Sequence, residues 1–565
     1  MASEDINKIY SNEYADVLIE YYGIPSNLDK YKDYGVNIIN YFLAVMHPPV
    51  SEMTQDMLAF DYSAIPMVLG LTNVTSLEDS GITRIRNIPN FDLRGKGVLI
   101  GIVDTGIDYT NPIFQFADKT TRIAAIWDQN MISDQEKEGI EYGTEYSRDQ
   151  INEALRSEDP YLIVPSRDEI GHGTMIAGIA AGNEVPEEGF YGVATDAELL
   201  VVKLKPAKEY LKEFFQIPKT AICYQENDLI FGVQYLLNYA ARVDQPIVIC
   251  ISCDTAQYAH DGRDIVSTWL SLQAGYTGTS VIIPVGNEGS ARRHYYGVIK
   301  EVPGYDQIEL NVGPEETGFS MEIWGASPNI FTIDILSPSG EYIPKLGARL
   351  SESRVISFIF EATIINVFYQ IAESQSGDQL ILLRFVKPAR GIWRFRVYGR
   401  GIFPMSYNVW LPMNGFITKD TFFVHSDPYT TLLSLSCATA PITVTAYDAE
   451  NDILYNEAGR GYTRIDEIKP DITAPGVNMI SPDLNHKFIK VTGTSVAAAY
   501  TTGVAAMLFE WGIINGNYPY MNTQDMKVFM LRGARRRPDT TYPNKDWGYG
   551  ILDVYDIFNS LRKGV

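Results

Sequence analysis

Cysteine is scarce in this sequence, with four residues in a chain of 565. Two of them, Cys250 and Cys253, have the Cys-x-x-Cys spacing that occurs in redox and metal sites. Here the pair lies inside the apolar run Ile247–Cys253 and has no second pair as a partner, so we predict buried structural thiols. The low cysteine content leaves no disulfide framework and is typical of a reducing compartment.

Positive charge is also in short supply. The chain has 46 Lys and Arg residues against 70 Asp and Glu residues, a net charge of −24. Nucleic acid and anionic membranes would repel it, so we expect neither as a partner. No run of about 18 apolar residues predicts a membrane span. The first residues, Met1–Lys8, lack the basic start and apolar stretch of a secretory signal. We therefore expect synthesis in the cytoplasm without a signal peptide.

What the sequence does contain is typical of a folded globular protein. Hydrophobic residues make up 45% of the chain, and its length predicts two or three domains. From Gly97 onward, short apolar segments alternate with helix-like segments, which predicts an α/β fold: a mostly parallel sheet with helices on both faces. We predict strands at 98–103, 199–204, 246–252, 281–285 and 442–447, and helices at 175–181, 229–242 and 265–274. The active site of such a sheet forms beyond the carboxyl ends of its strands.

Two stretches depart from this alternation. Residues 1–72 predict a small α+β unit of ferredoxin-like order, with strands at 16–21, within 36–47 (a pair) and at 65–69, and helices at 28–34 and 51–58. Residues 308–424 alternate apolar and polar side chains between turn residues, which predicts an inserted β-sandwich or jelly roll. The expected domains are 1–72, 73–307, 308–424 and 425–565, the second and fourth forming one α/β domain.

Two residues are candidates for a hydrogen-bonded acid and base. Asp104 follows the apolar run Val98–Val103, where a carboxylate could orient an imidazole; Asp-x-Gly is also common turn chemistry. His172 stands in Gly171-His-Gly-Thr, ahead of a small-residue segment that lets a helix pack closely beneath a site. A purely structural histidine is the alternative.

Two further residues are candidates for acyl-transfer chemistry. Ser495 begins a predicted helix, where free N–H groups and the helix dipole favour developing negative charge. Helix capping is the ordinary role of such a serine. Asn287, in Val285-Gly-Asn-Glu-Gly, could donate its amide to an oxyanion, or could belong to a turn.

Taken together and in this chain order, the blocks Asp104-Thr-Gly-Ile-Asp, Gly171-His-Gly-Thr, Gly286-Asn-Glu-Gly and Gly493-Thr-Ser resemble the signature segments of the subtilisin family. Matches at Lys469–Gly476 and Trp547–Gly550 extend the resemblance, which covers about residues 90–310 and 425–560. Within the family the chain is similar to the Csp subtilases of clostridia, on the segments Leu93–Thr110 and Arg122–Gln129 and on the long interval between the Asn and Ser blocks.

The resemblance implies a serine endopeptidase in which Ser495 is the nucleophile, His172 the general base, Asp104 its orienting carboxylate and Asn287 part of the oxyanion hole. It also implies that residues 1–72 are a propeptide that the protein removes itself, near Leu71–Asn73. The implied partners are a protein or peptide substrate, the propeptide and, as for the Csp subtilases, a spore cortex hydrolase precursor that is activated in germination. The protein would then be incorporated into the spore.

One segment departs from the family. Relatives have Ser-Leu-Gly where this chain has Ser252-Cys-Asp, in one wall of the pocket for the residue before the scissile bond. The resemblance therefore assigns Ser252, Cys253, Asp254 and Gly286 to the substrate pocket. Asp254 either favours a basic side chain there, narrows the pocket, or is a solvated loop residue.

Other functions stay open at this stage. The departures leave room for a weak or inactive pseudoprotease that holds a protein partner, and fold analogy alone favours carbohydrate binding by the inserted domain. The acyl-enzyme reaction requires no cofactor, and we predict no metal ligand set. Subtilisins often bind structural calcium; it is left unassigned here, because the sequence has no loop with EF-hand spacing.

Overall fold

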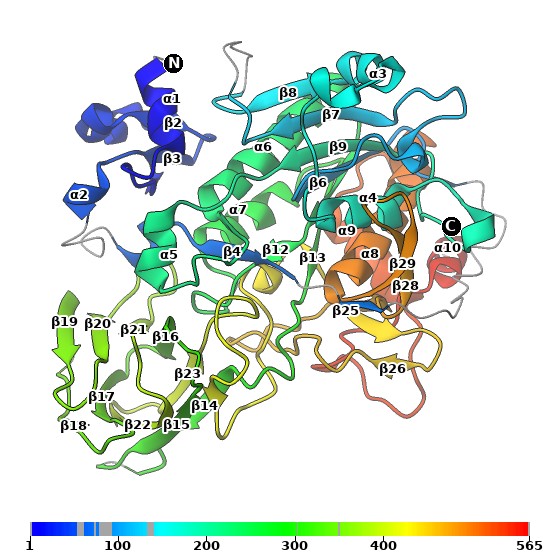
Figure 1. Cartoon of the computed structure of the whole chain (residues 1–565). Coiled ribbons are helices and arrows are strands. Elements are labelled where there is room, and N and C mark those ends of the chain that lie inside the picture. Colours follow the sequence, from blue (N-terminus) through cyan, green and yellow to red (C-terminus); the bar gives the residue numbers. More distant parts are fainter. Residues whose placement is uncertain are drawn as a thin grey trace.

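The computed structural model describes residues 3–53, 61–72, 75–77, 93–132, 140–301, 303–347 and 351–562. It has three parts: a small N-terminal domain, a central α/β domain and an inserted β-sandwich (Figure 1). The α/β fold with an additional β domain was predicted from the sequence and is confirmed.

A nine-stranded sheet forms the centre of the α/β domain, in the order β26-β25-β13-β11-β6-β9-β7-β8, with β27 beside β25. From β7 to β27 the neighbours are parallel, and β8 and β26 are antiparallel edges. The strands are β6 (Leu99–Asp104), β7 (Ile123–Asp128), β8 (Thr144–Ser147), β9 (Glu198–Lys203), β11 (Ile247–Ile251), β13 (Thr279–Pro284), β25 (Ile442–Asp448), β26 (Ile453–Leu454) and β27 (Ile472–Pro475). The five predicted strands are all present.

Both faces of this sheet are covered. Along β11, Ile247, Ile249 and Ile251 belong to one hydrophobic core, whereas Val248 and Cys250 belong to the other. The first core includes α5 (Glu209–Phe215), α6 (Glu226–Val243) and α7 (Ile265–Gln273); the second includes α3 (Arg148–Arg156), α4 (His172–Ala181), α8 (Thr494–Phe509), α9 (Thr523–Gly533) and α10 (Val554–Arg562). Burial on both sides explains why the strands are continuous apolar runs. All four cysteines are buried free thiols, as predicted.

The helix α8 lies at the centre of the second core. With the π-helical turn that follows it, it forms a segment, Thr494–Ile514, that is long and apolar enough to cross a membrane by length and composition, contrary to the sequence expectation of no such segment. However, 83% of its apolar window is buried inside the protein, where α8 packs against β25, β13 and β11. This burial accounts for its composition.

The N-terminal domain differs from the predicted ferredoxin-like unit. Its sheet has three antiparallel strands in the order β1-β3-β2, and the fourth predicted strand, β4, lies elsewhere, paired with β10 and β12 of the α/β domain. A helix that was not predicted, α1, precedes the sheet. The helix predicted at 28–34 is a 3₁₀ segment, and much of the helix predicted at 51–58 lies outside the described residues. The elements are α1 (Ser3–Tyr10), β1 (Val17–Glu20), a 3₁₀ segment (Pro25–Tyr34), β2 (Val36–Ile38), β3 (Leu43–Met46), α2 (Val50–Met53), β4 (Val68–Leu71), β10 (Cys223–Gln225) and β12 (Cys253–Asp254).

The inserted domain is a sandwich of two antiparallel sheets around its own hydrophobic core. One sheet contains β14 (His294–Val298), β23 (Ser406–Trp410), β16 (Gly318–Gly325), β21 (Gln379–Val386), β20 (Ile364–Gln370) and β19 (Ser351–Ser357). The other contains β18 (Tyr342–Ile343), β17 (Ile330–Leu336), β22 (Gly391–Arg400), β15 (Asp306–Val312) and β24 (Phe422–Phe423). Because β14 pairs with β23, the sandwich begins at His294, and the boundary predicted at 308 is too late.

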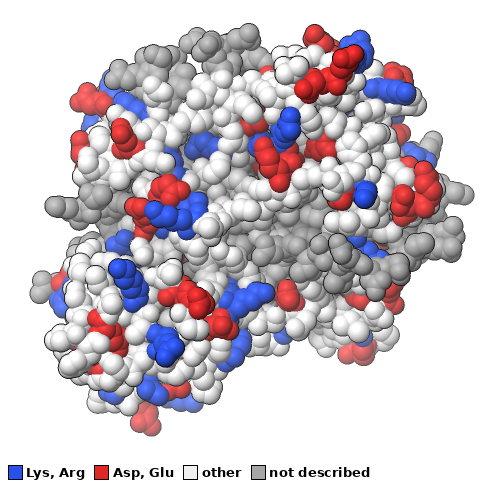
Figure 2. All heavy atoms as spheres, in the orientation of Figure 1, with Lys and Arg blue, Asp and Glu red and all other residues white. Residues whose placement is uncertain are grey.

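The surface carries charges of both signs. On the face drawn in Figure 2, Lys and Arg side chains are interspersed with Asp and Glu side chains. No continuous basic patch is visible among the residues described on that face.

Candidate active site

Asp104 and His172 meet at the carboxyl end of the central sheet. Asp104 is the last residue of β6, His172 is the first residue of α4, and both are buried. The Nδ1 atom of His172 lies 2.8 Å from Oδ1 and 2.9 Å from Oδ2 of Asp104. Burial alone would lower the pKa of His172, but the charge and hydrogen bond of Asp104 outweigh it and the pKa is raised. The pair can therefore orient the imidazole and stabilise its protonated form.

Asp168 fixes the start of α4 beside Asp104, and the sequence analysis missed it. Its carboxylate accepts hydrogen bonds from the backbone N–H groups of Gly171 (2.7 Å) and Thr174 (2.9 Å) and from the hydroxyl of Thr105 (2.8 Å). Close packing completes the arrangement, since a Cβ at Gly173 would lie 2.1 Å from the carbonyl oxygen of Gly106. The available signal was an Asp shortly before a predicted helix start, which is typical of capping.

Ser495 is the second residue of α8 and is fully buried. Its hydroxyl donates a hydrogen bond to the backbone carbonyl of Thr72, with an Oγ–O distance of 3.2 Å. The Thr72 backbone also contributes to the raised pKa of His172, although Nε2 of that histidine makes no hydrogen bond of normal geometry with a described residue. The Thr72 carbonyl thus lies beside both side chains.

Thr72 lies between two strands, β4 before it and β5 after it. Before Thr72, β4 is the middle strand between β10 and β12, both antiparallel to it. After it, β5 (Thr75–Leu77) pairs antiparallel with β29 (Phe488–Thr492), the strand that leads into Gly493 and α8; β28 (Met479–Pro482) lies on the other side of β29. The carbonyl next to the Ser495 hydroxyl therefore belongs to the residue directly after β4, a strand that is paired on both sides. Self-cleavage was predicted near Leu71–Asn73, of which Asn73 lies outside the described residues.

Two of the predicted pocket residues, Ser252 and Cys253, contact β4 or Thr72. The carbonyl of Ser252 accepts hydrogen bonds from the backbone N–H (3.2 Å) and the hydroxyl (3.0 Å) of Thr72. Cys253 pairs with Leu71 across β12 and β4. Gly286 has a φ of +86°, and a Cβ there would lie 2.5 Å from the side chain of Leu433, so both conformation and space require glycine.

The surroundings of Asp254 argue against two of the roles that the sequence left open, a solvated loop residue and a partner for a basic substrate side chain. It is fully buried, so it is not a solvated loop residue. Its carboxylate accepts hydrogen bonds from the backbone N–H groups of Thr255 (2.7 Å), Leu435 (2.9 Å) and Ser436 (3.2 Å). Burial raises its pKa well above the usual value. With its oxygens engaged by backbone donors, Asp254 ties β12 to the 435–436 segment rather than recognising a substrate cation.

Asn287 lies on the loop after β13, beside the start of α8. Its Oδ1 accepts a hydrogen bond from the backbone N–H of Thr494 (3.2 Å). The donor of this amide is therefore its Nδ2 atom. The inserted domain anchors this loop: Asn414 donates its side-chain amide to the Asn287 carbonyl (3.0 Å) and its backbone N–H to Glu288 (2.9 Å). Arg293 forms a buried ion pair with Glu288 (3.1 Å). The sequence analysis did not identify Asn414, because nothing local links it to residue 287.

No cluster of three or more His, Cys, Asp or Glu side chains is placed to hold a metal ion within the described part of the chain.

The sequence of this chain also matches a known protein family. The sequence model of the Subtilase family matches residues 95–302 and 427–550, more than half of the chain and the two stretches on either side of most of the sandwich. The chain belongs to the subtilase family. Among solved structures, this subtilase is similar to the CspB protease of Clostridium perfringens, with a TM-score of 0.74 and 29% identity over 84% of this chain and 95% of that one. The resemblance to Csp subtilases found in the sequence is thereby confirmed.

Curated relatives of this subtilase are named as proteinases and peptidases. The PIII-type proteinase of Lactococcus lactis subsp. cremoris is 21% identical over 84% of this chain, and the C5a peptidase of Streptococcus pyogenes serotype M6 is 24% identical over 74%. The subtilase matches only 26% and 34% of the lengths of these two relatives.

Proposed function

We propose that this subtilase is a serine endopeptidase that cleaves its own chain after Thr72 and then acts on protein or peptide substrates. One observation carries the proposal: the Ser495 hydroxyl lies 3.2 Å from the carbonyl oxygen of Thr72. Thr72 directly follows β4, which is paired on both sides as a protease pairs with an extended substrate. Residues 1–72 then act as a propeptide whose last residues occupy the substrate groove.

In the proposed mechanism, His172 accepts the Ser495 proton through Nε2 as the hydroxyl oxygen attacks the carbonyl carbon. The Asp104 carboxylate at Nδ1 holds the ring in the required tautomer and stabilises the imidazolium. The imidazolium then protonates the leaving amine, and water hydrolyses the acyl-enzyme. The amide of Asn287 and the backbone N–H of Ser495 are the proposed donors to the oxyanion.

The likeness to the CspB protease supports a narrower substrate proposal. The Csp resemblance in the sequence implies a spore cortex hydrolase precursor as substrate and the spore as the place of action. Incubating the processed enzyme with such a precursor, with the Ser495→Ala variant as control, tests this step separately from the endopeptidase activity.

A fluorophosphonate probe tests the general proposal, because it reacts only with an activated serine. After processing and release of residues 1–72 from the wild-type protein, we expect labelling at Ser495. The Ser495→Ala variant, which keeps residues 1–72, should take up no label. Absence of label on a processed, propeptide-free wild-type protein would instead favour a pseudoprotease that binds a partner.

Replacing Asn287 by Ala should lower kcat by about 10²- to 10³-fold with little change in KM, the loss found on removing one oxyanion donor. The measurement is steady-state hydrolysis of a peptide substrate. A fall in both kcat and the thermal unfolding temperature would point to a structural role through the hydrogen bond to Thr494. Asn414→Ala provides the comparison, since it removes the donor to the Asn287 carbonyl but leaves the Asn287 side chain in place.

A further inference from the structure

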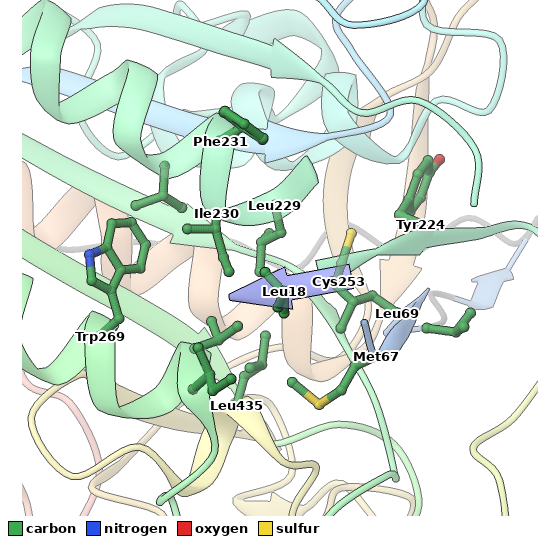
Figure 3. Packing of buried hydrophobic residues seen from close by; sticks show 14 of the residues in the cluster. Leu18, Met67, Leu69, Tyr224, Leu229, Ile230, Phe231, Cys253, Trp269 and Leu435 are labelled. Carbon is green, nitrogen blue, oxygen red and sulfur yellow. The ribbon is translucent and has the colours of Figure 1, made fainter. Parts of the chain in front are cut away.

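A loop of the inserted sandwich reaches the groove in which β4 lies. The loop joins β23 to β24 and carries Met413 and Phe416, which are 2% and 4% exposed. Both belong to the hydrophobic core that also contains Leu69 of β4, whose surroundings are drawn in Figure 3. The inserted domain therefore supplies part of the wall along β4, which ends one residue before Thr72.

Met413 and Phe416 occupy the space into which a side chain at position 70 would project. A Cβ built on Gly70 would lie 2.9 Å from Sδ of Met413 and 3.0 Å from Cζ of Phe416, closer than carbon contacts normally allow. The φ angle of Gly70 is not positive, so its backbone conformation suits any residue. Space, rather than conformation, accounts for glycine at this position.

The backbone of β4 cannot easily move away from this wall. Gly70 pairs with Cys223 on one side and with Asp254 on the other. Two buried side chains also anchor the strand. The backbone N–H of Met67 donates to Glu226 and that of Val68 donates to Gln257, each at 2.8 Å. A side chain at position 70 must therefore displace Met413 or Phe416.

We propose that Met413 and Phe416 make this enzyme selective for glycine at the third residue before the cleaved bond, counting Thr72 as the first. The inference rests on the proposed endopeptidase function and names its substrate class: extended segments with a glycine two residues ahead of the residue that is acylated. Alanine requires small shifts of the flexible end of Met413 and of the Phe416 ring, whereas a branched side chain requires the wall to open. The inserted domain thus takes part in substrate selection.

Peptides test the inference directly. The sequence Met67–Ser76 is compared with copies in which Gly70 is replaced by Ala or Leu, using processed wild-type enzyme. We expect kcat/KM to fall several-fold for Ala and at least about 100-fold for Leu, since overpacking of a closed site has costs of this order. The ratio between peptides is independent of the fraction of sites still blocked by propeptide.

Enlarging the pocket should reverse this preference. In the Met413→Ala enzyme we expect the ratio of Gly to Leu peptide to fall by at least tenfold, and in the full chain the self-processing blocked by Gly70→Leu should return when Met413→Ala is added. Met405→Ala is the matched control, because Met405 is a buried methionine of the same domain in the sandwich core. It should leave the ratio unchanged.

The outcomes separate the two proposals. Equal cleavage of the Gly and Leu peptides by wild-type enzyme would overturn the glycine selectivity and leave the endopeptidase standing. No cleavage of any peptide by a processed, propeptide-free enzyme would overturn the endopeptidase function itself.

Discussion

Full-length protein carrying Ser495→Ala should keep residues 1–72 covalently attached, whereas the wild-type chain should lose them at the bond after Thr72. The reason is that the hydroxyl next to the Thr72 carbonyl is the proposed nucleophile. Removing such a serine or its histidine lowers kcat by about 10⁶-fold in subtilisin, for which the effect is known. Intact-mass measurement of the purified proteins gives the result. Full-length mass in both would contradict self-processing, and loss of residues 1–72 in both would mean that another protease removes them.

Replacing Asp104 by Asn should produce a smaller but still large loss, about 10⁴-fold in kcat, because the imidazole is then held in the wrong tautomer. Combining this change with Ser495→Ala should add almost nothing, since the three side chains act as one unit. Asp118→Asn is the matched control: Asp118 lies at an exposed turn, where it accepts from Thr120, and should leave kcat unchanged.

The second large effect is expected at Asp16, where the N-terminal domain meets the α/β domain. Asp16 is 1% exposed, and its carboxylate lies 2.8 Å from Nζ of Lys208 and 2.7 Å from Nδ1 of His47. Burial would raise its pKa, but the charge of Lys208 and the hydrogen bond with His47 prevail and hold the pKa well below the usual range. Lys208 also donates to the backbone carbonyls of Lys8 and Tyr14, so this lysine is surrounded by the N-terminal domain.

In Asp16→Asn, the buried Lys208 loses its charged partner. Truncating one side of such an interfacial pair costs about 2–5 kcal/mol, so residues 1–72 should leave the processed complex about 30- to 5,000-fold more readily. Native mass spectrometry of the processed complex, followed over time after dilution, measures this dissociation. Asp29→Asn makes the same charge change at an exposed pair with Lys32 and should dissociate as the wild type does. Equal rates for the Asp16 and Asp29 variants would show that the buried pair does not retain the propeptide.

The sequence by itself determined the α/β fold and the residues of the candidate site. Strands that are buried on both faces must be continuous apolar runs. The helix that begins at His172 packs closely against a neighbouring turn, with Gly173 beside Gly106, so the histidine must be flanked by small residues. Such requirements are local, so they are written as short motifs around Asp104, His172, Asn287 and Ser495. Chain order and strand ends then place these motifs at one edge of the sheet.

Only the tertiary structure decided how the rest of the chain contacts that edge. The strand predicted at 65–69 was assigned to the N-terminal sheet, whereas the observed strand β4 (Val68–Leu71) pairs with β10 and β12. Local sequence could not show this pairing, because these partners lie more than 150 residues away. Asp254 had a solvated loop as one possible position, but its carboxylate is buried against the backbone N–H groups of Leu435 and Ser436. The contacts of Met413 with Gly70 likewise join residues of separate domains. Local patterns fix which face of a strand is buried, but which distant segment covers that face depends on packing among domains.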